Sequence, residues 1–203
     1  MGRAAKEPEG PRLHDTALGT DGGCAFTPDA VGALLDALDN KPSRYVFASS
    51  LSTYGSYDKP GLTEATEVAD ATEDDFARAA AVPLSDRASA TAYGPSYGPL
   101  KRACEKTAEL RLGNRATALR IGLIVGARDY TDRLTWWVRR IDEAGRSRSS
   151  TVVVPLPTER PVQVLDVRDA AEFAVLCAQD SLGGLWNVNG EVVTMNDLLT
   201  AIH

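Results

Sequence analysis

Residues 27–50, TPDAVGALLDALDNKPSRYVFASS, decide the fold class. Thr27 can cap a helix with Pro28 at its first position, and apolar residues then recur at helical spacing. Residues 44–50 follow as a short continuous apolar run, which is typical of a parallel strand covered on both faces. A helix that leads into a buried strand predicts an α/β domain with a doubly wound parallel sheet.

The rest of the chain continues this alternation. Helical spacing of apolar residues predicts helices over 97–112, 134–145, 169–177 and 195–202. Apolar runs predict strands over 116–125, 151–154, 162–167 and 185–189. The acidic, Gly- and Pro-containing stretch 51–96 is interpreted as a long solvated excursion. Residues 1–26 show neither period and are predicted to be a disordered tail before one domain at 27–203.

Composition places the chain of 203 residues among ordinary globular proteins, with 43% hydrophobic and 25% charged residues. A net charge of -6 and a pI near 5.0 offer no broad positive field for nucleic acid or anionic lipid, so neither is an expected partner. No stretch approaches the roughly 20 apolar residues of a membrane span, and the first residues lack a signal-peptide core. We therefore expect a cytoplasmic protein.

The cysteines and histidines do not indicate a disulfide framework or a metal site. Cys24, Cys104 and Cys177 are far apart, with no Cys-x-x-Cys spacing, and are interpreted as buried or incidental thiols. His14 and His203 each stand alone near a chain end, so we assign them no role.

Two short motifs carry candidate chemistry. Tyr97 and Lys101 are four residues apart at the start of a predicted helix, so both side chains project from one face. A nearby ammonium favours the phenolate and lowers a tyrosine pKa from about 10, which would let Tyr97 exchange a proton with a substrate. The alternative is an ordinary pair of surface residues.

The second motif is the hydroxyl cluster of residues 49–55, SSLSTYG, at the carboxyl end of the predicted strand 44–50. Ligands of open α/β sheets bind at that end, and a hydroxyl there could orient a reacting oxygen. The alternative is a serine-rich strand exit whose hydroxyls satisfy their own turn.

Together these motifs resemble the extended short-chain dehydrogenase/reductase family, also called the NAD-dependent epimerase/dehydratase family. The resemblance spans about residues 27–203. Five segments carry it: YVFASSLSTYG (45–55), YGPLK (97–101), RIGLIVG (120–126), RPVQVLDVRDAAEF (160–173) and WNVNG (186–190). It implies a Rossmann-like sheet with part of a small substrate domain, and NAD or NADP as the cofactor.

By position, the resemblance makes Ser50 the catalytic serine, which helps to hold the substrate oxygen. Tyr97 becomes the acid/base for hydride transfer at a carbinol or carbonyl, and Lys101 the lysine that also binds the nicotinamide ribose. Tyr97 and Lys101 are therefore also the expected cofactor-binding residues. Tyr93 begins a similar word, YGPS, but its fourth neighbour is Tyr97 rather than a lysine, so it is not chosen.

The sequence departs from the family at three places. No strand, glycine-rich turn and helix precede Thr27, and the cluster at 19–23 is not interpreted as a phosphate loop because no convincing strand leads into it. Ile121 stands where relatives usually have proline. Relatives also continue beyond His203. We therefore expect an incomplete sheet with an exposed edge, which a homo-oligomer would cover.

Three functions follow as alternatives. The first is an NAD(P)-dependent oxidoreductase or epimerase/dehydratase that acts on a small-molecule secondary alcohol or ketone. The second is a non-catalytic truncated relative or binding module. The third is a redox-independent proton-transfer enzyme that uses the same Ser50, Tyr97 and Lys101. The sequence indicates neither the substrate nor a choice between NAD and NADP.

Overall fold

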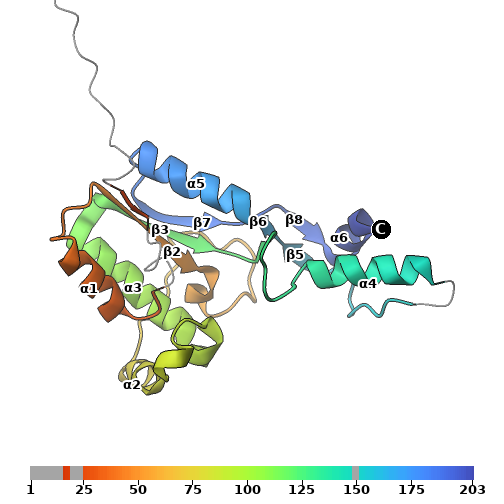
Figure 1. Ribbon diagram of the computed structural model, residues 1–203, viewed down its shortest axis with the longest axis horizontal. Coiled ribbons are helices and arrows are strands. Elements are labelled where there is room, and N and C mark those ends of the chain that lie inside the picture. The colour runs from red at the N-terminus through yellow and green to blue at the C-terminus, as the bar shows by residue number, and fades with distance from the viewer. Residues whose placement is uncertain (1–15, 19–24, 148–150) are drawn as a thin grey trace, which may run out of the picture. The chain divides into compact units, whose positions relative to one another are not determined.

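The computed structural model of the protein describes residues 16–18, 25–147 and 151–203 (Figure 1). The chain divides into two compact units. The first, here called the sheet unit, comprises residues 1–120 and 173–187. The second, here called the small unit, comprises residues 121–172 and 188–203.

The sheet unit is built on a four-stranded sheet in the order β1-β2-β3-β7. Its strands are β1 (Thr16–Leu18), β2 (Arg44–Ser50), β3 (Ala116–Ile121) and β7 (Gly184–Val188). β1 runs parallel to β2, with Thr16 opposite Arg44 and Leu18 opposite Val46. The predicted α/β class with a parallel sheet is confirmed.

The N-terminal segment differs from the predicted tail. The strand β1 lies inside residues 1–26, and Ala25 and Phe26 are buried. A three-residue edge strand is too short to show an apolar period, so it becomes visible only through its pairing with β2. A strand therefore does lead toward the glycine cluster 19–23, which lies outside the described residues together with 1–15, Cys24 and His14.

Two helices, both predicted from the sequence, pack together over the sheet: α1 (Pro28–Ala37) and α3 (Tyr97–Leu112) (Figure 1). α3 ends at Gly113, which has a φ of 55° that glycine adopts without a steric penalty. Apolar residues of both helices join those of β2 and β3 in one core. Its members include Val31, Leu35, Tyr45, Phe47, Cys104, Ala108, Leu112, Ala116 and Ala118.

The stretch 51–96 contains more structure than the predicted solvated excursion. It holds α2 (Glu73–Ala81) and three short 3₁₀ helices, η2 (Leu51–Tyr54), η3 (Leu84–Asp86) and η4 (Ala90–Ser96). A capping box between Thr72 and Asp75 starts α2, and the acidic residues of its first turn suit a helix N-terminus. The acidic run was therefore partly a helix-starting signal. A further 3₁₀ turn, η5 (Gly113–Arg115), follows α3.

The small unit contains two pairs of short strands. β4 (Ile124–Val125) runs parallel to β6 (Leu165–Asp166), and β5 (Pro161–Gln163) runs antiparallel to β8 (Val192–Thr194). Its helices are α4 (Thr135–Arg146) and α6 (Met195–Ile202), and α5 (Val167–Gln179) begins in this unit and ends in the sheet unit. The predicted cap of α6 at Thr194 is confirmed by a capping box with Asp197.

Four predicted elements differ here, and one of them, the strand expected over 162–167, is divided into β5 and β6. The strand expected over 116–125 stops at Ile121, where the backbone N–H of Gly122 turns to the carbonyl of Val188. Residues 151–154 form no strand although they are apolar. α5 begins at Val167 rather than at Asp169, because the side chain of Asp166 accepts the backbone N–H of Arg168 at 2.8 Å.

Candidate active site

Ser50 lies at the carboxyl end of β2, where the strand passes into η2. Its side chain is half-buried, and its Oγ accepts the backbone N–H of Ser52 at 3.1 Å. The Ser50 hydroxyl also lies 3.2 Å from the hydroxyl of Ser52, toward which it donates. The structure therefore places Ser50 at the end of the strand where ligands of open sheets bind, and it also shows the local turn contacts that the sequence left as an alternative.

Tyr97 is the first residue of α3 and is half-buried. Its ring is 5.8 Å from that of Phe26, and Phe26 also stacks on Tyr93 at 5.1 Å between ring centroids. Tyr93 is buried, and its hydroxyl donates to the carbonyl oxygen of Arg87 at 3.1 Å. Tyr93 therefore contributes to the packing of this cluster.

Lys101 follows one turn later on the same helix and is almost completely buried, with 2% of its surface exposed. Its Nζ donates to the carbonyl oxygen of Ala48 at 2.6 Å and to that of Ala25 at 3.1 Å. The ammonium also lies 4.3 Å from the ring centroid of Phe47, a cation–π distance. A buried ammonium needs such partners, and here they fix it against the end of β2.

The absence of a side chain at Gly98 brings the two motifs together. A Cβ added there would lie 2.1 Å from the carbonyl oxygen of Ser52, so only glycine permits this approach of α3 to η2. Since η2 begins directly after Ser50 and α3 begins with Tyr97, the serine and tyrosine motifs are held side by side.

A buried carboxylate one turn beyond Lys101 was missed by sequence reasoning. The side chain of Glu105 has no exposed surface, and its Oε1 accepts the hydroxyl of Ser49 at 2.6 Å. Arg120 binds both oxygens of Glu105, at 3.0 and 2.9 Å, and Arg102 adds a third guanidinium contact at 3.0 Å. The available signal was spacing, because Glu105 continues the interval of four from Tyr97 to Lys101.

This network extends to the strand β7. The guanidinium of Arg120 lies 4.8 Å from the ring centroid of Tyr54, whose hydroxyl donates to Oδ1 of Asn187 at 2.8 Å. The backbone N–H of Asn187 donates to Oε1 of Glu64 at 2.6 Å. Burial opposes the charge of Arg120, but the hydrogen bonds and charges of Glu105 and Tyr54 outweigh it and raise the pKa of the guanidinium. Arg120 and Tyr54 thus connect the helix α3, the turn η2 and the strand β7.

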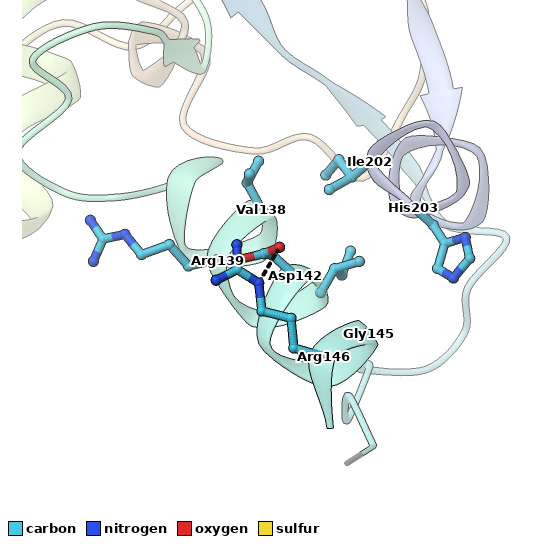
Figure 2. A pocket seen from close by; sticks show the side chains of 8 residues that line it. Val138, Arg139, Asp142, Gly145, Arg146, Ile202 and His203 are labelled. Atoms are coloured by element: carbon cyan, nitrogen blue, oxygen red, sulfur yellow. Dashed lines mark hydrogen bonds and ion pairs between the residues drawn. The ribbon is translucent and has the colours of Figure 1, made fainter. Parts of the chain in front are cut away.

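Two hollows lie outside the serine, tyrosine and lysine motifs. One, of about 410 Å³ in the sheet unit, is polar and is lined in part by Glu64, Arg102 and Arg120. The other, of about 570 Å³, lies in the small unit between α4 and α6, where Val138 and Ile202 lie near the Asp142–Arg146 ion pair (Figure 2). Neither hollow contains Ser50, Tyr97 or Lys101.

The described part of the chain contains no group of three His, Cys, Asp or Glu side chains that could hold a metal ion. Cys104 and Cys177 are buried and free, and burial raises the pKa of the Cys104 thiol to about 12. Among the described helices, none has the length and apolar content to cross a membrane.

No protein-family model and no curated protein matches the sequence. Solved structures do match its fold. A UDP-N-acetylglucosamine 4-epimerase from Methanobrevibacter ruminantium, in complex with UDP-N-acetylmuramic acid, is 20% identical with a TM-score of 0.59; the match covers 85% of this chain and 50% of that one. A putative epimerase from Burkholderia cenocepacia is 18% identical with a TM-score of 0.61, covering 94% and 55%.

A third match is a UDP-glucuronic acid 4-epimerase from Bacillus cereus in complex with NAD, 17% identical with a TM-score of 0.57, covering 85% of this chain and 50% of that one. The chain thus spans about half the length of these solved structures. The protein therefore shares the fold of about half of each of these solved epimerases. This is the fold that the resemblance of its sequence implies.

Proposed function

We propose that the protein is an NAD(P)-dependent oxidoreductase or epimerase/dehydratase that acts on a secondary alcohol or ketone of a small molecule. One observation carries the proposal: the close approach at Gly98 holds the motif of Ser50 against the motif of Tyr97 and Lys101, at the carboxyl end of a parallel strand. The fold that the chain shares with NAD-complexed epimerases supports it.

In this proposal the three side chains divide the proton chemistry. Tyr97 takes the proton of the substrate hydroxyl during oxidation and returns it to the oxygen during reduction. Ser50 donates a hydrogen bond to the same oxygen, after its hydroxyl turns away from Ser52. Lys101 supplies a positive charge whose position at the end of β2 is fixed, because its ammonium donates to the Ala48 carbonyl.

The ammonium of Lys101, which the resemblance assigns to the nicotinamide ribose, is buried as placed, with 2% of the residue's surface exposed. Direct contact of the Lys101 ammonium with a ribose would require the residues that cover it to move, among them Ala25, whose carbonyl it binds, and Phe26, whose ring centroid lies 5.3 Å away. The glycine cluster 19–23 lies outside the described residues. The assignment of Tyr97 and Lys101 as cofactor-binding residues is thus part of the proposal, and so is the choice of NAD or NADP.

The first test is calorimetric binding of NADH and NADPH to the purified chain. Micromolar binding supports the oxidoreductase or epimerase proposal. If millimolar cofactor does not bind, the redox proposal is wrong, and turnover without cofactor separates the other two functions. A proton-transfer enzyme would still turn over its substrate without cofactor, whereas a non-catalytic relative or binding module would show no turnover.

The second test follows turnover on a panel of nucleotide sugars, a substrate class chosen because the matched epimerases are described with UDP-sugars. Tyr97→Phe should lower turnover about 10²- to 10⁴-fold, because it removes the proton partner and keeps the ring packed on Phe26. Tyr130→Phe is the matched control, since Tyr130 is 90% exposed and should leave turnover unchanged. Equal rates in both variants would contradict the role of Tyr97.

A cytoplasmic location, the absence of nucleic-acid and membrane partners, and a homo-oligomer also belong to the proposal. Among the described strands, β1 and the part of β2 beyond Val46 form one edge of the sheet, because β1 pairs only with Arg44–Val46 of β2. A homo-oligomer would cover this edge. Sedimentation of the purified chain tests the oligomer, and a cooperatively folded monomer would exclude it.

A further inference from the structure

The buried carboxylate of Glu105 stands in a regular geometric relation to the proposed catalytic residues. On α3, Tyr97, Lys101 and Glu105 are spaced by four residues and therefore follow one face of the helix. On β2, three successive residues face them or lead to the site. Ala48 accepts Lys101, Ser49 donates to Glu105, and Ser50 begins the turn η2.

These contacts form two side-chain links, here called clamps, between α3 and the end of β2. The first joins Lys101 Nζ to the Ala48 carbonyl at 2.6 Å, and the second joins Glu105 Oε1 to the Ser49 hydroxyl at 2.6 Å. Ser50 is the next residue along the strand. The two clamps therefore help to set the position of Ser50 relative to Tyr97, although neither of these residues takes part in them.

The second clamp is anchored from the neighbouring strand. Arg120 of β3 binds both oxygens of Glu105 and is 1% exposed, and Arg102 contacts the carboxylate from the same helix. A carboxylate held by two guanidinium groups in a water-excluded place has little freedom to rotate. The hydroxyl of Ser49 thus meets an acceptor whose position is fixed.

We infer that Glu105, held by Arg120, is a positioning residue that sets the Ser50 end of β2 against the Tyr97 face of α3 through the hydroxyl of Ser49. As a role in catalysis, this inference rests on the proposed function. The structural part of the inference does not rest on the proposed function, because it concerns only the stability of the turn after Ser49. The two parts can therefore be tested separately.

The structural test uses Ser49→Ala, which removes the donor to Glu105 and leaves both arginine contacts in place. Hydrogen exchange is followed by NMR at the amide of Ser52, which donates to Ser50 Oγ. Loss of the clamp should speed this exchange about 3- to 10-fold, the change expected for one net hydrogen bond. The amides of Leu119 in β3 and Leu35 in α1 serve as internal references and should not change.

Three further variants sharpen the result. Ser49→Thr keeps a hydroxyl and should restore slow exchange at Ser52. Glu105→Gln should reproduce the effect of Ser49→Ala if the variant folds, and Glu109→Gln, on the exposed part of the same helix, is the matched control with no effect. The inference is overturned if Ser52 exchange stays within twofold of the wild type in Ser49→Ala, or if the reference amides accelerate equally.

If the wild-type chain turns over a substrate, Ser49→Ala should lower kcat by a similar factor at unchanged KM, and Ser49→Thr should restore it. A merely structural loss would instead lower the melting temperature without this separation of kcat from KM. A changed KM with normal kcat would contradict the catalytic part. If the wild-type chain neither binds cofactor nor turns over, the proposed function fails, and the exchange at Ser52 still decides the structural part.

Discussion

The sheet unit and the small unit bury different kinds of side chain. Within the described residues, every buried polar or charged side chain lies in the sheet unit: Ser49, Thr53, Asp75, Ser96, Lys101, Glu105, Thr117 and Arg120. The buried side chains of the small unit are apolar: Val125, Leu165, Ala170, Val188 and Met195. The two units therefore depend on different stabilising contacts.

The long-range contacts of the sheet unit explain this difference. Glu105 joins α3 to β2 and β3, so its burial is compatible with stability only when all three elements are in place. In the small unit, polar groups act mostly over short range, as in the exposed pair of Asp166 with Arg168 and the i,i+4 pair of Asp142 with Arg146. α4 has no buried residue at all. We expect mutations in the sheet unit to cost more stability.

The largest difference should come from apolar truncation. Leu100→Ala removes a side chain with no exposed surface from the cluster around Phe26 and Tyr93, and should cost about 2–5 kcal/mol of unfolding free energy. Val138→Ala on α4, which is 45% exposed, should cost less than about 0.5 kcal/mol. Urea denaturation of each variant measures both values.

Leu110→Ala is the control within α3, because Leu110 is 87% exposed and alanine favours the helix. It should leave the unfolding free energy almost unchanged. A loss at Val138 as large as that at Leu100 would break the comparison of the two units.

A second, smaller difference is expected at two helical glycines. In Gly98→Ala the new Cβ meets the backbone of Ser52, which cannot yield without moving η2 or α3, so the variant should lose about 1–3 kcal/mol. In Gly145→Ala no described heavy atom lies within 4 Å of the new Cβ, and the variant should gain about 0.5–1 kcal/mol from helix propensity. Thermal unfolding followed by circular dichroism compares the two, and equal signs would contradict the role given to Gly98.

The smallest difference concerns two capping boxes of the same kind. Thr72→Ala and Thr194→Ala each remove the hydroxyl that accepts the N3 backbone N–H, and each should cost about 0.5–2 kcal/mol. The loss should be greater for Thr72, because Asp75 is buried whereas Asp197 is exposed. Thermal unfolding at pH 7 measures both losses.

The pH dependence of these caps has a definite sign. Hydrogen bonds from the Thr72 backbone and side chain lower the pKa of Asp75, and those from Thr194 lower the pKa of Asp197. A carboxyl with a lowered pKa in the folded state stabilises above its ordinary value near 4, and this stability is lost as the pH falls through the folded pKa. The effect of each Thr→Ala variant should therefore shrink as the pH falls below about 4, and a constant difference would exclude this linkage.

Part of the candidate site followed from spacing in the sequence. The interval of four residues at the start of a helix placed Tyr97 and Lys101 on one face, because a helix fixes that geometry locally. The helix α1, the strand β2 and the cap of α6 were likewise predictable, since each shows its period or its capping residue within a few positions.

Other features were decided by contacts between distant parts of the chain. The strand β1 is defined by its pairing with β2, and the burial of Glu105 is defined by Arg120 and Ser49, which lie 15 and 56 residues away. The sequence placed Lys101 on one helix face with Tyr97 but did not indicate that its ammonium is buried and donates to the carbonyls of Ala25 and Ala48. A local pattern carries no information on such partners, because a buried charge is placed by the elements that surround it.

The sequence by itself therefore determined the α/β class, the order of most elements and the helical face that carries Tyr97 and Lys101. Only the tertiary structure decided how that face meets the end of β2, through the close approach at Gly98 and the buried Ser49–Glu105–Arg120 contacts. The physical reason is the distance along the chain over which each kind of interaction acts. Periodicity and capping act within about one turn of helix, whereas close backbone approach and the burial of charge depend on segments that meet only after folding.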